Sequence, residues 1–138
     1  MFEEAMIAPC GLDCSLCSMA HKKQEPCPGC MGPDDCKPEF CSVRCTIIQC
    51  EKRRANQYRF CDQCPDFPCE FSREREKRYQ FQYALRESPL TNLREIRELG
   101  RERFLEQQRS RWTCGECGGV ILVHDGICSG CGKAHTLQ

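Results

Sequence analysis

The chain has 138 residues, 16 of them cysteine, and a formal net charge of zero. Its length fits one ordinary domain, and because the 40% hydrophobic fraction includes the cysteines, the remaining apolar side chains are too few for a large core. The balanced charge and the absence of a run of about 20 apolar residues argue against a globally basic nucleic-acid binder and a membrane-spanning helix.

Residues 1–9 are expected to form a short lead-in. Glu3 and Glu4 stand where a signal peptide would be basic, and no long apolar run follows them. We therefore expect a cytoplasmic protein with reduced thiols. In that setting, Cys-x-x-Cys pairs indicate metal ligands rather than disulfides, and metal can stabilise a domain that has a thin core.

Residues 10–45 are rich in cysteine, proline, glycine and aspartate, which predicts loops and tight turns folded around metal. One helix is expected within residues 1–71, over residues 46–58, with Ile47, Cys50, Arg54 and Tyr58 on one side. The candidate metal ligands here are Cys10, Cys14, Cys17, Cys27, Cys30, Cys36, Cys41, Cys45, Cys50, Cys61, Cys64 and Cys69.

Twelve cysteines divide naturally into three four-cysteine sites. The preferred partition is Cys14, Cys17, Cys27 and Cys30 in one site, Cys45, Cys50, Cys61 and Cys64 in a second, and Cys10, Cys36, Cys41 and Cys69 in a third. Interleaved sites or shared sulfurs are equally compatible with the spacing. His21 lies between two of the cysteine pairs and is a further candidate ligand.

An iron–sulfur cluster is the rival cofactor. Cys10, Cys14 and Cys17 have the Cys-x-x-x-Cys-x-x-Cys spacing of radical S-adenosylmethionine enzymes, but the chain is too short for the barrel that those enzymes need. A [4Fe–4S] electron-transfer cluster in the N-terminal module remains the alternative. Cys64-Pro65 is similar to the end of a ferredoxin motif, although the complete ferredoxin series is absent.

Residues 72–111 predict a helical hairpin. The first helix is expected over residues 72–87, with Ser72 as its N-cap. Ser88 and Pro89 then break the chain and begin a second helix, which continues to about Arg109 with Gly100 as a weak point. An apolar stripe along the second helix predicts a buried face; its members are Leu90, Leu93, Ile96, Leu99, Phe104 and Leu105.

The helical segment carries 11 Lys/Arg against 7 Asp/Glu, so it is the one region that could offer a basic face to nucleic acid. Tyr79 and Phe81 would be available for base stacking. Interleaved glutamates favour a solvated, ion-paired surface instead. The basic residues concerned are Arg73, Arg75, Lys77, Arg78, Arg94, Arg97, Arg101 and Arg103.

Residues 112–138 predict a zinc ribbon. Its ligands are Cys114, Cys117, Cys128 and Cys131. Two Cys-x-x-Cys-Gly turns can place four sulfurs tetrahedrally around zinc, and the glycines allow positive φ so that amides can turn toward sulfur. Residues 120–123 are expected to form a strand that ends in an Asp125-Gly126 turn. His124 is expected at the surface, and Trp112 is expected to pack the ribbon onto the second helix.

Together these features predict a small metal-stabilised α+β protein with three parts. Residues 1–71 form a loop-rich multi-zinc module, residues 72–111 a helical hairpin and residues 112–138 a zinc ribbon. Up to about four zinc ions can be accommodated if every site uses four cysteines.

The cysteine pattern resembles a prokaryotic family known as the domain of unknown function 3795. The resemblance covers roughly residues 8–71. The segments that carry it are Cys10-Gly11-Leu12-Asp13-Cys14-Ser15-Leu16-Cys17, Cys27-Pro28-Gly29-Cys30, Cys45-Thr46-Ile47-Ile48-Gln49-Cys50 and Phe60-Cys61-Asp62-Gln63-Cys64-Pro65-Asp66-Phe67-Pro68-Cys69. It implies metal binding, with zinc as the expected metal, and it implies no established activity.

All recognisable sites contain only cysteine and look closed, whereas catalytic zinc keeps an open position. The sequence contains no His-Glu metalloprotease motif and no hydrolase serine elbow. A non-catalytic adaptor with a protein partner is therefore the leading interpretation, and a nucleic-acid partner is possible but not favoured. The oligomeric state is not indicated.

Overall fold

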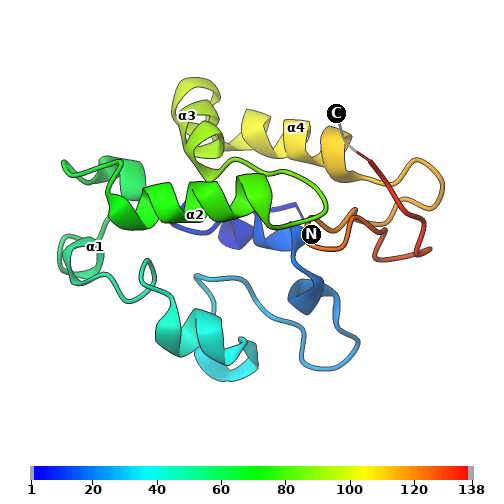
Figure 1. The fold of residues 1–138 in the computed structure, drawn as a ribbon, viewed down its shortest axis with the longest axis horizontal. Coiled ribbons are helices and arrows are strands. Elements are labelled where there is room, and N and C mark those ends of the chain that lie inside the picture. The colour runs from blue at the N-terminus through cyan, green and yellow to red at the C-terminus, as the bar shows by residue number, and fades with distance from the viewer. Residues whose placement is uncertain (1, 137–138) are drawn as a thin grey trace.

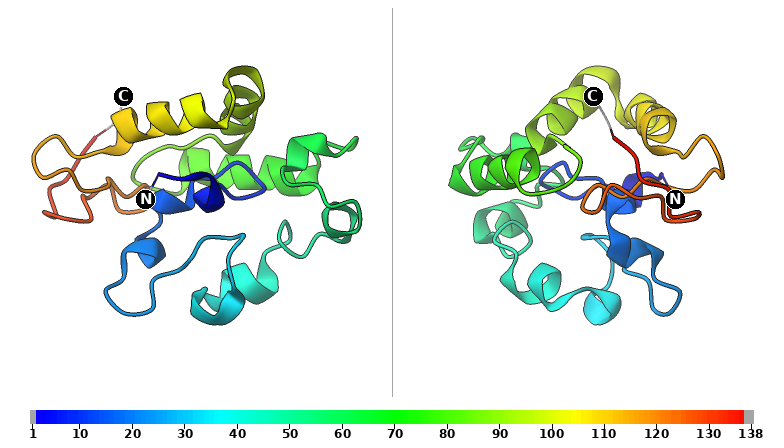
Figure 2. Two further views of the ribbon diagram at one scale, coloured as in Figure 1. Left: turned by 180° about the vertical axis from the view of Figure 1, so that it is seen from behind. Right: turned by 45° about the vertical axis from the view of Figure 1, so that its right-hand side comes forward.

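The computed structural model describes residues 2–136, and its regular elements are helices. Their bounds are Glu51–Ala55 for α1, Glu70–Phe81 for α2, Pro89–Leu99 for α3 and Arg101–Trp112 for α4. Figures 1 and 2 show the N-terminal segment (blue) running between helices α3 and α4 on one side and the cysteine-rich loops (cyan) on the other. The protein is thus a small, helix-rich fold.

Helix α2 is shifted from the predicted range of 72–87. It begins after Cys69, which holds the N-cap position, so the expected cap Ser72 lies inside the helix and is buried. The helix ends at Phe81 because the next residues pair with the C-terminal region. The N–H groups of Ala84 and Leu85 donate to the carbonyls of His124 and Val123 at 3.2 and 3.0 Å.

The start of α3 confirms the prediction for Ser88 and Pro89. The Ser88 side chain accepts a hydrogen bond from the Thr91 N–H at 3.1 Å, and Pro89 is the first helical residue. The single helix to Arg109 is wrong, because Gly100 adopts φ 88° and ψ 158° and ends α3. Residues in that region of φ/ψ space are almost always glycine. The predicted hairpin therefore contains three helices.

Helix α1 is shorter than the expected 46–58. Residues 46–49 form turns, in which Ile47 is buried, and the α-helix begins only after Cys50. Arg53 on α1 donates to the carbonyls of Ile47 and Ile48, both at 3.1 Å. Its guanidinium thus satisfies carbonyls that a longer helix would have bonded itself.

The predicted strand over residues 120–123 does not form. Within residues 2–136, β pairing is limited to isolated bridges, such as those joining Thr113 to Val120 and Ile121 to Cys128. The predicted α+β class is therefore not confirmed, because these residues contain no β-sheet. The predicted turn is present: Gly126 has φ 71°, and its N–H donates to the Leu122 carbonyl at 2.9 Å.

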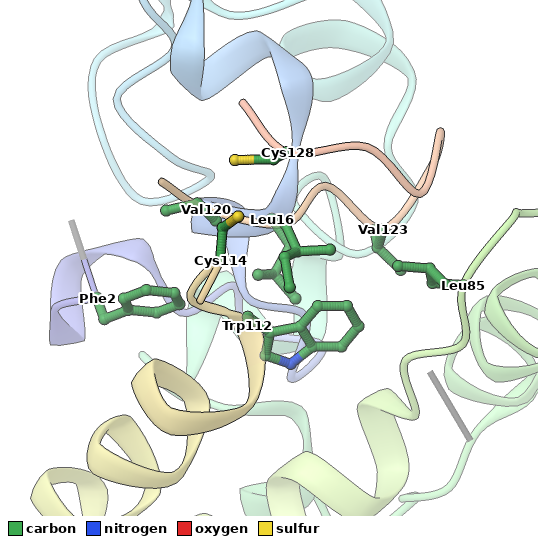
Figure 3. Close-up of a cluster of buried hydrophobic side chains, with 9 residues drawn as sticks. Phe2, Leu16, Leu85, Trp112, Cys114, Val120, Val123 and Cys128 are labelled. Carbon is green, nitrogen blue, oxygen red and sulfur yellow. The ribbon is translucent and has the colours of Figure 1, made fainter. Parts of the chain in front are cut away.

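One hydrophobic cluster joins all three predicted segments (Figure 3). Trp112, the last residue of α4, is 1% exposed and packs with Leu16 from the N-terminal module and Val120 from the C-terminal region. This confirms the packing role expected for Trp112. The same cluster contains Cys114 and Cys128, so a change in the position of either cysteine would disturb the packing of this core.

A second cluster secures α3 and α4 to the N-terminal half. Leu93, Ile96 and Phe104 from the predicted apolar stripe pack there against Ile7 and Phe60. Half of the predicted stripe is therefore core, whereas Leu90 and Leu105 are only partly buried and Leu99 is 37% exposed. None of the helices within residues 2–136 combines the length and the apolar character needed to cross a bilayer.

Candidate metal centres

In the part of the chain that the structure describes, the C-terminal cysteines form the tightest group of possible metal ligands. The Sγ atoms of Cys114, Cys117, Cys128 and Cys131 all lie within 4.8 Å of one another. The Sγ separations are 3.9 Å for Cys114–Cys131 and 3.3 Å for Cys117–Cys128. Four sulfurs about 2.3 Å from one ion would be separated by distances of this order. The cluster can hold a metal ion.

Backbone amides point at these sulfurs. The N–H of Gly119 donates to Cys117 Sγ, and the N–H of Gly130 donates to Cys128 Sγ, both at 3.3 Å. The positive φ expected at the glycine after each pair is confirmed, with 77° at Gly118 and 76° at Gly132. These two glycines turn the chain and donate to the carbonyls of Cys114 and Cys128, and neighbouring amides turn toward sulfur as predicted.

The amides favour the charged form of a ligand sulfur. Burial opposes ionisation of the Cys128 thiol, but hydrogen bonds from the N–H groups of Cys131 and Gly130, together with those from the Cys117 and Cys114 sulfurs, lower the pKa to about 6. The Glu116 and Cys117 amides lower the pKa of Cys114 as well. For Cys131 the Lys133 N–H acts in the same direction, but burial and the hydrogen bonds with the other three sulfurs raise its pKa to about 11. Cys114 and Cys128 are thus the sulfurs closest to the thiolate form that metal binding requires.

The N-terminal cysteines are arranged differently, around a cavity of about 180 Å³. Six of them line it: Cys10, Cys14, Cys17, Cys27, Cys30 and Cys41. The Cys14 thiol donates to Cys30 Sγ at 3.5 Å. No three His, Cys, Asp or Glu ligand atoms within residues 2–136 meet as closely as the C-terminal quartet does. These sulfurs therefore surround a space instead of converging on a point.

Burial keeps several of these thiols neutral when no metal is bound. It raises the pKa of Cys10 to about 12, although the Arg75 guanidinium acts in the opposite direction. The pKa of Cys17 is raised mainly by burial, with a smaller contribution from the charges of Cys41 and Cys27. A cation in the cavity would offset the burial cost for all of these sulfurs together.

Helix α2 supplies the opposite wall of the cavity with Arg75, Arg78 and Tyr79. The Arg75 guanidinium donates to Cys45 Sγ at 3.4 Å. The Tyr79 hydroxyl lies 3.0 Å from His124 Nε2. His124 is thus half-buried against the cavity rather than free at the surface, and burial lowers its pKa. Contacts between such distant positions leave no signal in local sequence patterns.

The remaining cysteines lie outside the lining of this cavity. Cys45 is buried with Cys10 in a small hydrophobic cluster, and Cys36 ends a single-turn helix. Cys50, Cys61, Cys64 and Cys69 lie in the segment that leads into α1 and α2. The cavity thus gathers the predicted first quartet together with Cys10 and Cys41 of the predicted third quartet, whereas Cys36 and Cys69 do not line it.

His21 has a different role from the one considered for it. Its Nε2 atom lies 2.6 Å from the Ser15 carbonyl, so with a proton on that nitrogen it donates to the backbone. The ring therefore fixes the turn that follows Cys14. It is not among the residues that line the cysteine cavity.

A buried polar network holds the Cys10–Cys14 turn, and its members lie too far apart in the sequence for a local pattern to indicate it. Asp13 accepts hydrogen bonds from the Ser15 N–H at 2.9 Å and from Gln108 Nε2 at 3.2 Å. Asn92 Nδ2 donates to the Gly11 carbonyl at 2.9 Å and to Glu87 Oε2 at 3.0 Å. The turn that carries Cys10 and Cys14 is thus fixed by residues from α3 and α4 and by Glu87 in the connection before α3.

The basic residues of the helical segment do not stand free on one face. Arg97 pairs with Asp62 at 3.4 Å, and Arg101 pairs with Glu4. Arg73 donates to the Pro68 carbonyl at 2.7 Å. Several of the arginines considered for phosphate binding are therefore engaged within the protein.

Comparison with known proteins supports the resemblance seen in the sequence. No curated protein and no solved structure matches the chain. The model of one family, described as a protein of unknown function (DUF3795), matches residues 6–74, which include every cysteine of the N-terminal half. The chain therefore belongs to the DUF3795 family.

Proposed function

We propose that this protein is a non-catalytic zinc protein that acts as an interaction module. The observation that carries the proposal is the closed C-terminal quartet, whose four sulfurs are mutually within 4.8 Å. Four thiolates fill the tetrahedral coordination of zinc and leave no position for a substrate or water. Zinc bound in this way contributes folding free energy rather than catalysis.

The location of the quartet supports a structural role. Cys114 and Cys128 belong to the same buried cluster as Trp112 and Leu16. A metal ion that fixes these two cysteines would also hold the N-terminal module against α4. Its removal would disturb packing across the whole molecule.

Exposed aromatic side chains support an interaction surface. Phe40 and Phe71, each 40% exposed, line a groove of about 110 Å³ with Arg44 and Arg78. The Arg78 guanidinium lies 5.3 Å from the centre of the Phe40 ring. Aromatic and arginine side chains are enriched where proteins bind one another. Three arginines and one glutamate, Glu74, line the groove, so its net positive charge fits a partner protein that presents acidic and apolar side chains.

The zinc site is tested by metal analysis and X-ray absorption of purified protein. We expect zinc coordinated by sulfur alone at the C-terminal quartet. An exchangeable water ligand on this zinc would overturn the non-catalytic interpretation, since it would show an open coordination position.

The interaction surface is tested with paired variants of the full chain in a capture experiment on lysate of the source organism. Replacing both Phe40 and Phe71 with alanine is expected to abolish the capture of specific proteins. Phe81→Ala is the matched control, because Phe81 is 77% exposed and does not line the groove. If the wild type, the double variant and Phe81→Ala capture the same proteins, the groove is not the interaction surface.

A second candidate is an iron–sulfur protein, favoured by the arrangement of the N-terminal cysteines around a cavity of about 180 Å³. Cys10, Cys14 and Cys17, which have cluster-type spacing, all line it. A [4Fe–4S] cluster would supply one-electron transfer there. Protein purified without oxygen would then be brown and contain iron and acid-labile sulfide. A colourless protein with stoichiometric zinc would exclude this candidate.

A further inference from the structure

The cavity that the six N-terminal cysteines line has an opposite wall for which metal coordination gives no reason. Helix α2 supplies Arg75, Arg78 and Tyr79 to this wall. Tyr83 joins it from the segment after the helix, and His124 from the C-terminal region. The wall therefore combines positive charge with aromatic surface.

The two arginines have no carboxylate partner. Neither takes part in an ion pair within residues 2–136. Arg75 donates to Cys45 Sγ at 3.4 Å, and sulfur is a weak acceptor. The Arg78 guanidinium lies 5.3 Å from the centre of the Phe40 ring, which accepts no conventional hydrogen bond. Both side chains are half-buried, so they present several N–H donors to an anion at this position.

The aromatic side chains of this wall form a continuous group. The ring centres of Tyr79 and Tyr83 are 4.8 Å apart, and those of Tyr83 and His124 are 4.3 Å apart with nearly perpendicular planes. The Tyr79 hydroxyl lies 3.0 Å from His124 Nε2, so these two polar atoms can satisfy each other. The rings are then available to pack against an apolar group.

The space itself is small and bordered by apolar side chains. Its volume is about 180 Å³, and its lining includes Ala8, Leu12, Ala20 and Val123, all of which are buried. An apolar protein cavity of about 150 Å³ holds a benzene molecule. The cavity therefore has room for one aromatic ring or one branched aliphatic group, which is too little for a segment of polypeptide.

The charges are distributed along the cavity. Asp13 and Glu87 also line it, but Glu87 Oε2 accepts from the Asp13 N–H at 2.8 Å and Asp13 accepts from Gln108 at 3.2 Å. Both carboxyl groups are almost completely buried. Arg75 and Arg78, in contrast, also line the groove beside the exposed Phe40. The positive groups thus lie at the mouth of the cavity.

We propose that this cavity binds a small organic acid, either an aromatic or a branched aliphatic carboxylate. The carboxylate pairs with Arg75 and Arg78 at the mouth, and the apolar body enters the cavity beside Tyr83 and Val123. Arginine is suited to this task because its planar guanidinium binds a carboxylate through two parallel N–H groups. An enclosed apolar space with a few convergent polar groups is the usual form of a ligand site. This binding function goes beyond the proposed interaction function and does not depend on it.

The first test is an NMR titration of the full-length protein, with its metal bound, with phenylacetate. We expect saturable binding with a Kd of about 1 mM or lower, and shifts in the amide signals of Ala20 and Val123. Phenylacetamide lacks the charge and acetate lacks the apolar body, so each should bind at least about 10-fold more weakly. Absence of saturable binding, or equal affinity for phenylacetate and either analogue, would overturn the proposal.

The second test removes one arginine. Arg78→Gln should weaken phenylacetate binding by about 10-fold and leave the metal content unchanged. Lys77→Gln is the matched control, because Lys77 is a neighbouring cation on α2 that is exposed and lines neither the cavity nor the groove. Unchanged affinity in Arg78→Gln, or an equal loss in Lys77→Gln, would contradict the site.

Metal content separates this proposal from a rival role for the arginines, which is to balance the charge of metal-bound thiolates. Arg75 contacts the Cys45 sulfur, so Arg78 is the more decisive position. Loss of metal from Arg78→Gln would assign this arginine to the cysteines and overturn the proposal. If Arg78→Gln does not fold, the comparison of the three compounds on the wild-type protein still decides the question.

Discussion

The main-chain N–H of Asp13 donates a hydrogen bond to Glu87 Oε2 at 2.8 Å, across 74 positions of sequence. Glu87 is almost completely buried and also accepts from Asn92. A single carboxylate therefore connects the turn that carries Cys10 and Cys14 to the residues that begin α3.

Glu87→Gln should make stability less dependent on pH. Burial, with a further contribution from the Asp13 charge, raises the pKa of Glu87 to about 8, above its ordinary 4.5. Between pH 4.5 and pH 8, Glu87 is therefore protonated more often in the folded state than in the unfolded state. The wild-type protein thus loses stability as the pH rises through this range. At pH 8.5 we expect the free energy of unfolding of the variant to exceed that of the wild type by on the order of 2 kcal/mol.

The measurement is chemical unfolding of both proteins at pH 5 and pH 8.5 with zinc in excess. Glutamine can still accept from Asp13 and Asn92 through its carbonyl oxygen, so the network survives the change. Parallel loss of stability in the two proteins would show that Glu87 is not the titrating group.

Gly11→Ala should strongly destabilise the fold. Gly11 has φ 101°, and a Cβ there would lie 2.3 Å from the Pro89 carbonyl oxygen. Both the backbone strain and the clash with rigid backbone oppose the substitution, and we expect a loss of roughly 3 kcal/mol or more in the free energy of unfolding. Gly132→Ala is the control, since Gly132 has φ 76° and open space around it. Equal losses in the two variants would refute the clash.

Removing metal from the C-terminal quartet should expose Trp112. This is the only tryptophan in the chain, and it packs with Cys114 and Cys128. A strong chelator is expected to shift its fluorescence to longer wavelength because the ring becomes solvated, and added zinc should reverse the shift. If the emission maximum does not move on complete loss of zinc, the metal is not needed to keep Trp112 buried.

Gly119→Ala should weaken metal binding at the C-terminal quartet. A Cβ at Gly119 would lie 2.9 Å from Cys128 Sγ and 3.0 Å from the Gly130 nitrogen. The sulfur and the amide must then shift, and we expect zinc affinity to fall by about 10-fold to 100-fold. Gly115→Ala, with open space around it, should bind as the wild type does in a competition titration. Equal affinities for all three would show that the close approach is unimportant.

Local patterns predicted the features that depend on neighbouring residues. Ser88 and Pro89 begin α3 as expected, because capping needs only a side-chain acceptor and a fixed φ within one turn. Leu93, Ile96 and Phe104 are buried as their spacing indicated. The C-terminal quartet followed from two Cys-x-x-Cys turns, each of which is local.

Tertiary packing decided where elements end. Helix α2 stops at Phe81 because Ala84 and Leu85 donate hydrogen bonds to the C-terminal region. Residues 120–123 form bridges instead of a strand, because their neighbours turn to present sulfur and amide groups to the cysteine cluster. Helix and strand propensity act over a few residues and cannot register such distant partners.

The sequence by itself determined that this protein is a cysteine-rich member of the DUF3795 family with ligand sets suited to metal. Only the tertiary structure gathered Cys10 and Cys41 around the cavity with the two short cysteine pairs. Spacing defines pairs, because a short turn fixes two sulfurs relative to each other. Which pairs meet depends on how distant segments pack, and here Glu87, Asn92 and the helices set that packing.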